Sequence, residues 1–360
     1  PISRAVIKGL VMQGRKVIDL GMISSDMMYF AVGKLQLAGG AMITASHNPG
    51  EYNGIKLTGA GVAPIGQDTG LSKIKEIVAS DNFKPARQGG RSTKGDILEE
   101  WIRHAIRVIP SLRDLHIGYD AGNGMAGIFV SELRKQTPLH IEGLYLHPDG
   151  TFPNHPANPL EFDNLKDLIA LVRTKALDCG IAFDGDGDRA FLVDEKGEVL
   201  TGSILGALII QKVLTQNPGA TILYNAITSK VVSDTINKMG GKGIRTKVGH
   251  SFIKAEMKKH DAVFACEHSG HFYFKSNYNA DSGLIAALMA LGMLRGSSSS
   301  LSGLCEPLRS KYFDSGEINY EISDIKAAIA DISKEFADGE QDSLDGLTVN
   351  YKDWWLNVRP

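Results

Sequence analysis

The sequence predicts an α/β fold of three similar domains with mixed, mostly parallel sheets, followed by a smaller, incomplete α+β domain. Helical apolar spacing alternates with short apolar runs typical of strands, which is the pattern of α/β units. The pattern recurs three times along the 360 residues, each time over about 100 residues, a normal domain size. We therefore divide the chain into residues 1–91, 92–198, 199–305 and 306–360.

The first domain begins with a helix for which Ser3 is a candidate N-cap. Its second strand ends at the loop around Ser46, and the polar, glycine-rich stretch 88–92 is a candidate linker. The expected elements are helices over 3–13, 26–37 and 72–80, and strands over 16–20 and 40–44.

The second and third domains repeat the alternation, and the serine run 297–300 is a candidate loop. In the second domain we expect helices over 98–109, from about 126, and over 165–174, with strands over 116–120, 179–183 and 190–193. In the third we expect helices over 204–214, 231–239, 252–259 and 283–294, with strands over 221–224, up to about 248, and over 262–266.

Composition argues against several classes of partner. The formal net charge is -2 and no long run of Lys or Arg occurs, so we expect neither nucleic acid nor a membrane as the main partner. Three scattered cysteines, no signal peptide and no apolar run of 18 residues predict a cytoplasmic protein. The chain starts without Met and stops at Pro360, so we expect segments to be missing at both ends. Monomer and homodimer both remain open.

An acidic loop, Asp184-Gly185-Asp186-Gly187-Asp188-Arg189, directly follows an expected strand. Three carboxylates this close repel one another, and a bound cation would neutralise them. Oxygen ligands suit Mg²⁺ or Ca²⁺, and Mg²⁺ with few protein ligands is typical of sites that share the metal with a phosphate. Arg189 is placed to hold a phosphate oxygen. The alternative is a solvated acidic turn.

An EF-hand is the first rival for this loop. Asp184, Asp186, Asp188 and Glu195 fit its ligand positions, but Arg189 stands where that loop needs glycine. Strands rather than helices flank the segment, so we reject the EF-hand.

The second segment is Thr44-Ala45-Ser46-His47-Asn48-Pro49, with Lys56 shortly after it. A hydroxyl at a tight turn after a strand can act as a nucleophile, and Lys56 could transfer a proton if its surroundings lower its pKa. Neither residue is diagnostic alone, because an Asn-Pro turn that contains a serine explains the segment as well.

Two further loops have polar side chains suited to sugar phosphates. Glu267-His268-Ser269-Gly270-His271 follows an expected strand, and Glu and Ser together can bind neighbouring sugar hydroxyls. A polar capped loop is an equally good reading. Gly249-His250-Ser251 precedes an expected helix, with Lys247 and Lys254 close by, which is a weak signal for a phosphate site.

A glycine-rich turn supports an alternative function of another class. Gly122-Asn123-Gly124-Met125-Ala126-Gly127 matches the dinucleotide fingerprint, and Asp149 follows at a suitable distance. An NAD-dependent dehydrogenase is therefore a second hypothesis. Against it, Asp149 stands in a Pro-Asp-Gly turn and the acidic loop would have no role.

Together these segments resemble the α-D-phosphohexomutase superfamily, and within it the bacterial phosphomannomutases. The resemblance covers essentially the whole chain and is specific in the order and spacing of its segments. The matching segments are 44–49 with 53–56, 184–189, 249–254, 267–271 and 355–360.

The resemblance implies four domains around one central cleft. Ser46 would carry a phosphoryl group and, with Asp184, Asp186 and Asp188, would hold Mg²⁺. The other residues that the resemblance assigns to catalysis or substrate binding are His47, Lys56, Arg189, His250, Glu267, Ser269, His271 and Arg359. The chain departs from the family in lacking the N-terminal segment with its active-site Arg, in ending at Pro360 within the phosphate loop, and in having Ile227 where many relatives carry Lys.

The implied reaction is the interconversion of mannose 6-phosphate and mannose 1-phosphate. Phosphorylated Ser46 would give its phosphoryl group to the free hydroxyl, and the hexose 1,6-bisphosphate would return its other phosphate to Ser46. The alternatives are a phosphoglucomutase, a phosphoglucosamine mutase, the dehydrogenase, and a non-catalytic binder of sugar phosphates.

Overall fold

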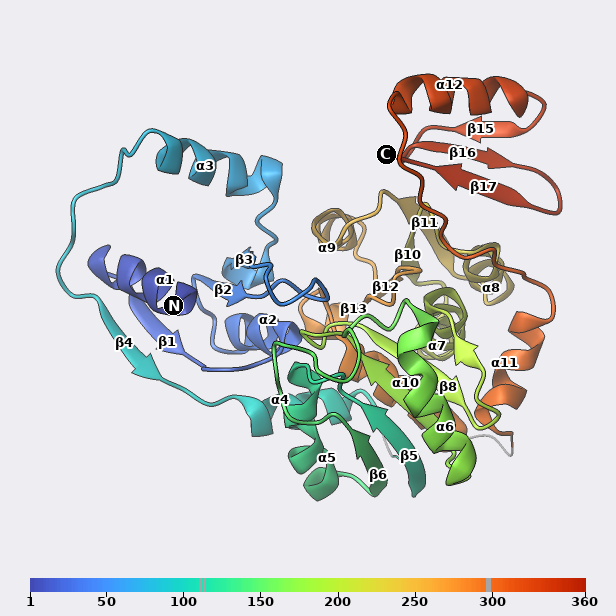
Figure 1. Cartoon of the computed structure of the whole chain (residues 1–360), viewed down its shortest axis with the longest axis horizontal. Coiled ribbons are helices and arrows are strands. Elements are labelled where there is room, and N and C mark those ends of the chain that lie inside the picture. The colour runs from blue at the N-terminus through green and yellow to red at the C-terminus, as the bar shows by residue number, and fades with distance from the viewer. Residues whose placement is uncertain (110–111, 113, 296–298) are drawn as a thin grey trace.

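The computed structural model describes all residues except 110–111, 113 and 296–298. Part of the serine run 297–300 therefore lies outside the described residues. Figure 1 shows the first unit in blue and cyan, the second in green, the third from yellow-green to orange, and the C-terminal unit in red.

The second unit contains a mixed sheet with the strand order β6-β5-β7-β8-β9. β5 pairs in parallel with β6 and β7, whereas β7, β8 and β9 pair in antiparallel fashion. Helix α6 packs on β5 and β7. Its elements are α4 (Leu98–Arg107), β5 (Leu115–Asp120), α5 (Val130–Gln136), β6 (Leu139–Leu144), α6 (Lys166–Thr174), β7 (Cys179–Phe183), β8 (Ala190–Asp194) and β9 (Val199–Leu200).

The third unit repeats this topology in a sheet with the order β11-β10-β12-β13-β14. Again two parallel pairings are followed by two antiparallel ones. Its elements are α7 (Gly202–Gln216), β10 (Thr221–Asn225), α8 (Lys230–Lys238), β11 (Lys242–Thr246), α9 (His250–Lys259), β12 (Phe264–Cys266), β13 (Phe272–Phe274), β14 (Ala280–Asp281), α10 (Gly283–Arg295) and α11 (Leu301–Arg309).

The first unit has, among the described residues, two separate two-stranded sheets, β1–β4 parallel and β2–β3 antiparallel. The predicted linker at 88–92 is wrong in part, because Arg91 and Ser92 lie in β4 and pair with β1. Ser3 is not the N-cap, because α1 already begins at Ile2. Its elements are α1 (Ile2–Met12), β1 (Lys16–Asp19), α2 (Ser25–Lys34), β2 (Gly39–Ile43), β3 (Ile55–Gly59), α3 (Ser72–Ala79) and β4 (Arg91–Lys94).

The C-terminal unit is a helix over a three-stranded antiparallel sheet, as the α+β prediction requires. It lies against the third unit, where Arg245 of β11 contacts Asp342 and Thr348, and Lys230 of α8 donates to the Tyr351 carbonyl at 2.9 Å (Figure 1). Its elements are α12 (Ile325–Glu335), β15 (Glu340–Asp342), β16 (Leu347–Asn350) and β17 (Trp355–Val358).

One continuous hydrophobic core runs through the first three units. It extends from Ile23 at the start of α2 to Leu308 in α11. Helices α7 and α10 both contact β8 of the second sheet, and α7 also contacts β12 of the third, so these helices form a layer shared by two units. No helix in the described part of the chain is both long and apolar enough to span a membrane.

Candidate active site

Two of the predicted site loops lie at the carboxyl ends of parallel strands. Asp184 follows β7, and Glu267 follows β12 in the neighbouring unit. The carboxyl ends of parallel strands in α/β sheets are where ligands usually bind, because loops open there. The two ends meet directly, since Arg189 and His271 form an antiparallel bridge between the second and third units.

The acidic loop is buried, and its three carboxylates converge. Asp184, Asp186 and Asp188 have ligand atoms within 4.8 Å of one another and are almost wholly inaccessible to solvent. Burial, together with the charges of Asp188 and Asp186, raises the pKa of Asp184 well above its usual range. Such a group of carboxylate oxygens can hold a metal ion.

Ser46 lies beside this loop although 138 residues separate it from Asp184. Its Oγ is 3.2 Å from Asp184 Oδ2 and 3.2 Å from Asp186 Oδ1. Its backbone has a positive φ of 56°, and its N–H donates to Thr44 Oγ1 at 2.8 Å. The turn thus directs the hydroxyl towards the carboxylates.

Two cations partly neutralise the loop. Lys56 Nζ lies 2.7 Å from Asp186 Oδ2 and 2.6 Å from Asp188 Oδ2. Burial alone would raise the pKa of Asp188, but Lys56, and to a smaller extent His271, lower it below its usual value. Arg189 Nε lies 3.2 Å from Asp184 Oδ2.

The contacts of the Asp188 carboxylate show whether the loop can hold a cation. Asp188 Oδ1 is buried without a hydrogen-bond partner among the described residues, although His271 Nε2 is 3.6 Å away. An uncompensated buried carboxylate oxygen beside two further carboxylates and a hydroxyl is suited to a hard cation. The residues present therefore fit a bound divalent metal.

His47 lies between Ser46 and Arg189. Its Nδ1 is 3.3 Å from Ser46 Oγ and 2.6 Å from an Arg189 Nη atom. Burial, followed by the charge of Arg189, lowers the pKa of His47 to about 4. The imidazole is therefore neutral at neutral pH and accepts a hydrogen bond from the guanidinium.

Polar partners hold the predicted sugar-binding loop. Glu267 accepts hydrogen bonds from Asn225 Nδ2 at 2.9 Å and from the Tyr273 hydroxyl, and its burial raises its pKa. Ser269 Oγ lies 3.0 Å from His271 Nδ1. Burial, followed by Arg189, lowers the pKa of His271 to about 3.

His250 and Arg359 are the two predicted site residues that are exposed among the described residues. His250 is an exposed residue at the start of α9, and partial desolvation of its ring, followed by the charge of Lys254, lowers its pKa. Arg359 is exposed just after β17 and, among the described residues, makes no hydrogen bond or ion pair with another predicted site residue.

Sequence reasoning missed a buried set of residues behind the site. Ser25 Oγ donates to Asp186 Oδ2 at 2.6 Å, and its N–H donates to the Asp186 carbonyl. Lys254 Nζ pairs with Asp281 Oδ1 at 2.6 Å and lies 3.6 Å from the centre of the Tyr29 ring. Lys254 was noted in the sequence only as a weak signal for a phosphate site, whereas in the structure it is buried and paired with Asp281.

The glycine-rich turn is packed by the protein itself. A Cβ at Gly124 would lie 2.7 Å from the carbonyl oxygen of Gly185, so the acidic loop lies directly against this turn. Asp149 is bonded within its own turn, to Thr151. The dinucleotide interpretation is therefore wrong, and the glycine serves close packing of the two loops.

Comparison with known proteins decides the family. The phosphoglucomutase/phosphomannomutase α/β/α domains I, II and III match residues 1–85, 99–197 and 201–312. The phosphohexose mutases of Xanthomonas campestris are 36% identical to this chain, over 99% of its length and 81% of theirs. The chain belongs to the phosphoglucomutase/phosphomannomutase family.

Two further comparisons within the phosphoglucomutase/phosphomannomutase family agree. A phosphomannomutase of Salmonella typhimurium is 36% identical over 99% of this chain and 81% of the relative. The solved structure of a family protein from Burkholderia thailandensis has a TM-score of 0.84 and 30% identity, covering 98% of this chain and 78% of that one. The chain is thus a phosphosugar mutase, an isomerase that works by phosphoryl transfer.

Proposed function

We propose that this mutase interconverts mannose 6-phosphate and mannose 1-phosphate through a phosphorylated Ser46 and a hexose 1,6-bisphosphate. The observation that carries the proposal is the position of Ser46 Oγ, 3.2 Å from a carboxylate oxygen of Asp184 and of Asp186. A phosphoryl group on that oxygen would stand beside the metal-binding carboxylates. The phosphomannomutase names of relatives favour mannose.

The proposed metal is Mg²⁺, held by Asp184, Asp186, Asp188 and an oxygen on Ser46. When bound, it would withdraw charge from the phosphate and so assist transfer. The all-oxygen donor set supports Mg²⁺ over a softer ion.

In the proposed reaction the bond between Ser46 Oγ and phosphorus breaks as a sugar hydroxyl bonds to phosphorus. The hydroxyl proton passes to a neutral base, for which we assign His250, and returns to the enzyme oxygen. Lys56 and Arg189 would neutralise the moving phosphoryl group, which is the main requirement of this chemistry. His47 would orient Arg189.

The substrate-binding roles are likewise proposals. Glu267 and Ser269, with His271, would bind sugar hydroxyls from β12 and the loop after it. Arg359 would hold the phosphate that does not react, once the C-terminal unit meets the substrate. The domain limits at residues 91, 198 and 305 are kept as part of this proposal.

Mass spectrometry and kinetics test the proposal. We expect an intact mass with one extra phosphate that maps to Ser46. Ser46→Ala should abolish turnover of mannose 1-phosphate while sugar-phosphate binding persists, and the exposed Ser310→Ala serves as the control. Near-normal turnover by Ser46→Ala would contradict the mechanism. Faster turnover of glucose 1-phosphate would keep the mechanism and reject mannose as the substrate.

A further inference from the structure

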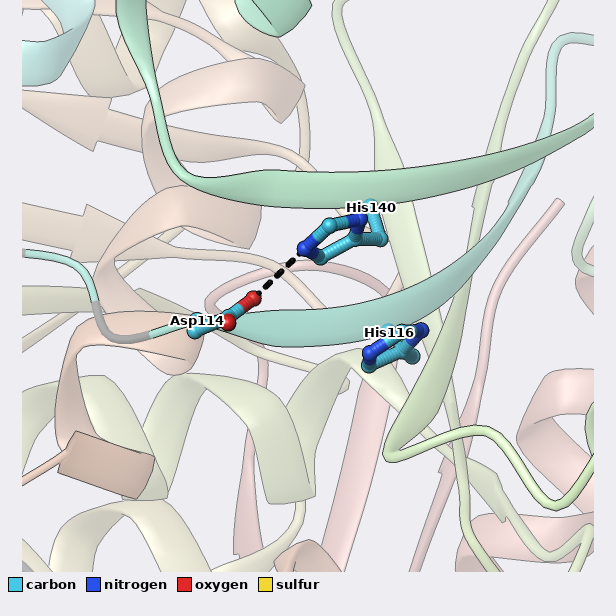
Figure 2. A group of neighbouring side chains, drawn as sticks. All are labelled: Asp114, His116 and His140. Carbon is cyan, nitrogen blue, oxygen red and sulfur yellow. Dashed lines mark ion pairs between the residues drawn. The ribbon is translucent and has the colours of Figure 1, made fainter.

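Two histidines and an aspartate meet at the end of the second sheet opposite to the active site. His116 lies near the start of β5 and His140 near the start of β6 (Figure 2), directly opposite each other in the parallel register. Residues opposite each other in neighbouring strands share a face of the sheet. In the register of β5 and β7, His116 is level with residue 178, six residues before Asp184. At a rise of about 3.3 Å per residue along a strand, the histidine pair lies about 20 Å from the acidic loop.

The three side chains already bring one potential ligand atom each close together. The imidazole rings of His116 and His140 are stacked, with centroids 4.4 Å apart and planes at 9°. Asp114 Oδ1 is 2.8 Å from His140 Nε2 (Figure 2). One ligand atom from each residue lies within 4.8 Å of the others.

The remaining movement is small. A tetrahedral Zn²⁺ with bonds of about 2.1 Å has its ligand atoms about 3.4 Å apart. The ligand atoms therefore need to close by at most about 1.4 Å, and the stacked imidazole rings must turn so that a nitrogen of each points at the same ion. All three are exposed, so rotation about their side-chain bonds meets little resistance. The backbone is held in place, because the N–H of His116 donates to Asp178 Oδ2 at 2.8 Å.

We propose that Asp114, His116 and His140 form a surface binding site for a divalent transition-metal ion, with Zn²⁺ as the representative. Two imidazoles and one carboxylate suit Zn²⁺ and not Mg²⁺, which prefers oxygen ligands alone. Solvent completes the coordination, since the cluster is open to water. An ion of this class would join the starts of two neighbouring strands without touching the reacting groups.

A surface ion pair is the competing explanation. On this explanation the contact between Asp114 and His140 is only an ion pair that stabilises the fold. Exposed pairs of this kind contribute only about 0–1 kcal/mol to stability. An ion pair gives no role to His116, whereas a metal site does. The effect of replacing His116 therefore distinguishes the two explanations.

The experiment is calorimetric titration of the full chain with Zn²⁺ in the presence of saturating Mg²⁺. The Mg²⁺ occupies the aspartate loop and so keeps Zn²⁺ from binding there. We expect His116→Ala and His140→Ala each to weaken Zn²⁺ binding at this site at least about tenfold, because each removes a direct ligand. The control is His147→Ala, which replaces an exposed histidine just after β6 and should bind Zn²⁺ as the unmodified protein does.

Histidine proton NMR with Zn²⁺ supplies a second readout that does not depend on activity. The histidine signals that Zn²⁺ shifts in the unmodified protein should be the ones that are missing from the spectra of His116→Ala and His140→Ala. Unchanged affinity in His116→Ala, or no Zn²⁺ binding in saturating Mg²⁺, would overturn the proposal. A loss confined to His140→Ala would overturn it too, because His116 would then not be a ligand.

Discussion

Replacing Gly185 by alanine should separate the two halves of the active site without unfolding the protein. A Cβ at this position would lie 2.5 Å from the carbonyl oxygen of Ser46, whereas ordinary contacts begin at 3.4 Å. Gly185 does not have a positive φ, so alanine is disfavoured there by this contact and not by backbone strain. One of the two loops must retreat by the difference, about 0.9 Å.

That displacement changes the distance between Ser46 Oγ and the carboxylates of the acidic loop. It would move Ser46 Oγ away from the carboxylates that it meets at 3.2 Å. Since a misplacement of about 1 Å can reduce turnover about 100-fold, we expect kcat of Gly185→Ala to fall by about that factor. Overpacking of this size should cost about 1–3 kcal/mol of stability, which lowers Tm but leaves the protein folded.

A coupled assay of hexose-phosphate interconversion, together with a thermal melt, measures both effects. Gly150→Ala is the matched control, because a Cβ there meets nothing within 4 Å and the glycine has no positive φ. A kcat within threefold of the unmodified enzyme for a folded Gly185→Ala would refute the reasoning, since the contact would then be of no consequence.

Two further predictions concern buried charge and pH. Lys254→Met leaves the Asp281 carboxylate buried without its partner, which should cost about 3–5 kcal/mol in the free energy of unfolding. The control, Lys258→Met at an exposed position of the same helix, should have the Tm of the unmodified protein. An unchanged Tm for Lys254→Met would contradict the prediction. The pKa of His155 is raised by its hydrogen bond to Asp120, so its stabilising contribution is present below the unfolded pKa of about 6.5 and is lost as pH rises through the folded pKa. The Tm loss of His155→Gln should therefore be larger near pH 5.5 than near pH 8.5, and an equal loss at both would argue against it.

The local sequence signalled the acidic loop but not what surrounds it. Asp184 and Asp186 alternate with glycine directly after an apolar run, and such a pattern is visible within ten residues. The contact of Asp186 with Ser25 is not visible in this way, because it depends on how the start of α2 meets a loop 161 residues away. No periodicity or spacing encodes a contact of that range.

The same limit explains the differences in the fold. Alternating strands and helices predict parallel pairing, and β5 with its neighbours follows that rule. The antiparallel strand β8 corresponds to the strand expected over 190–193, whereas β13 was not expected. In both places the chain turns back at once at a loop, which the alternation of strands and helices does not encode. Helix α5 begins at Val130, later than expected, because residues 125–129 form a 3₁₀ turn first.

The bridge between Arg189 and His271 has a consequence for how the protein loses its structure. Since the hydrophobic core is continuous from Ile23 to Leu308, and Ala190 donates a backbone hydrogen bond to the Gly270 carbonyl, the second and third units share both apolar surface and ladder. Neither can melt without exposing part of the other. Calorimetry should therefore record them as one cooperative transition, with hydrogen exchange at the two bridging loops occurring together.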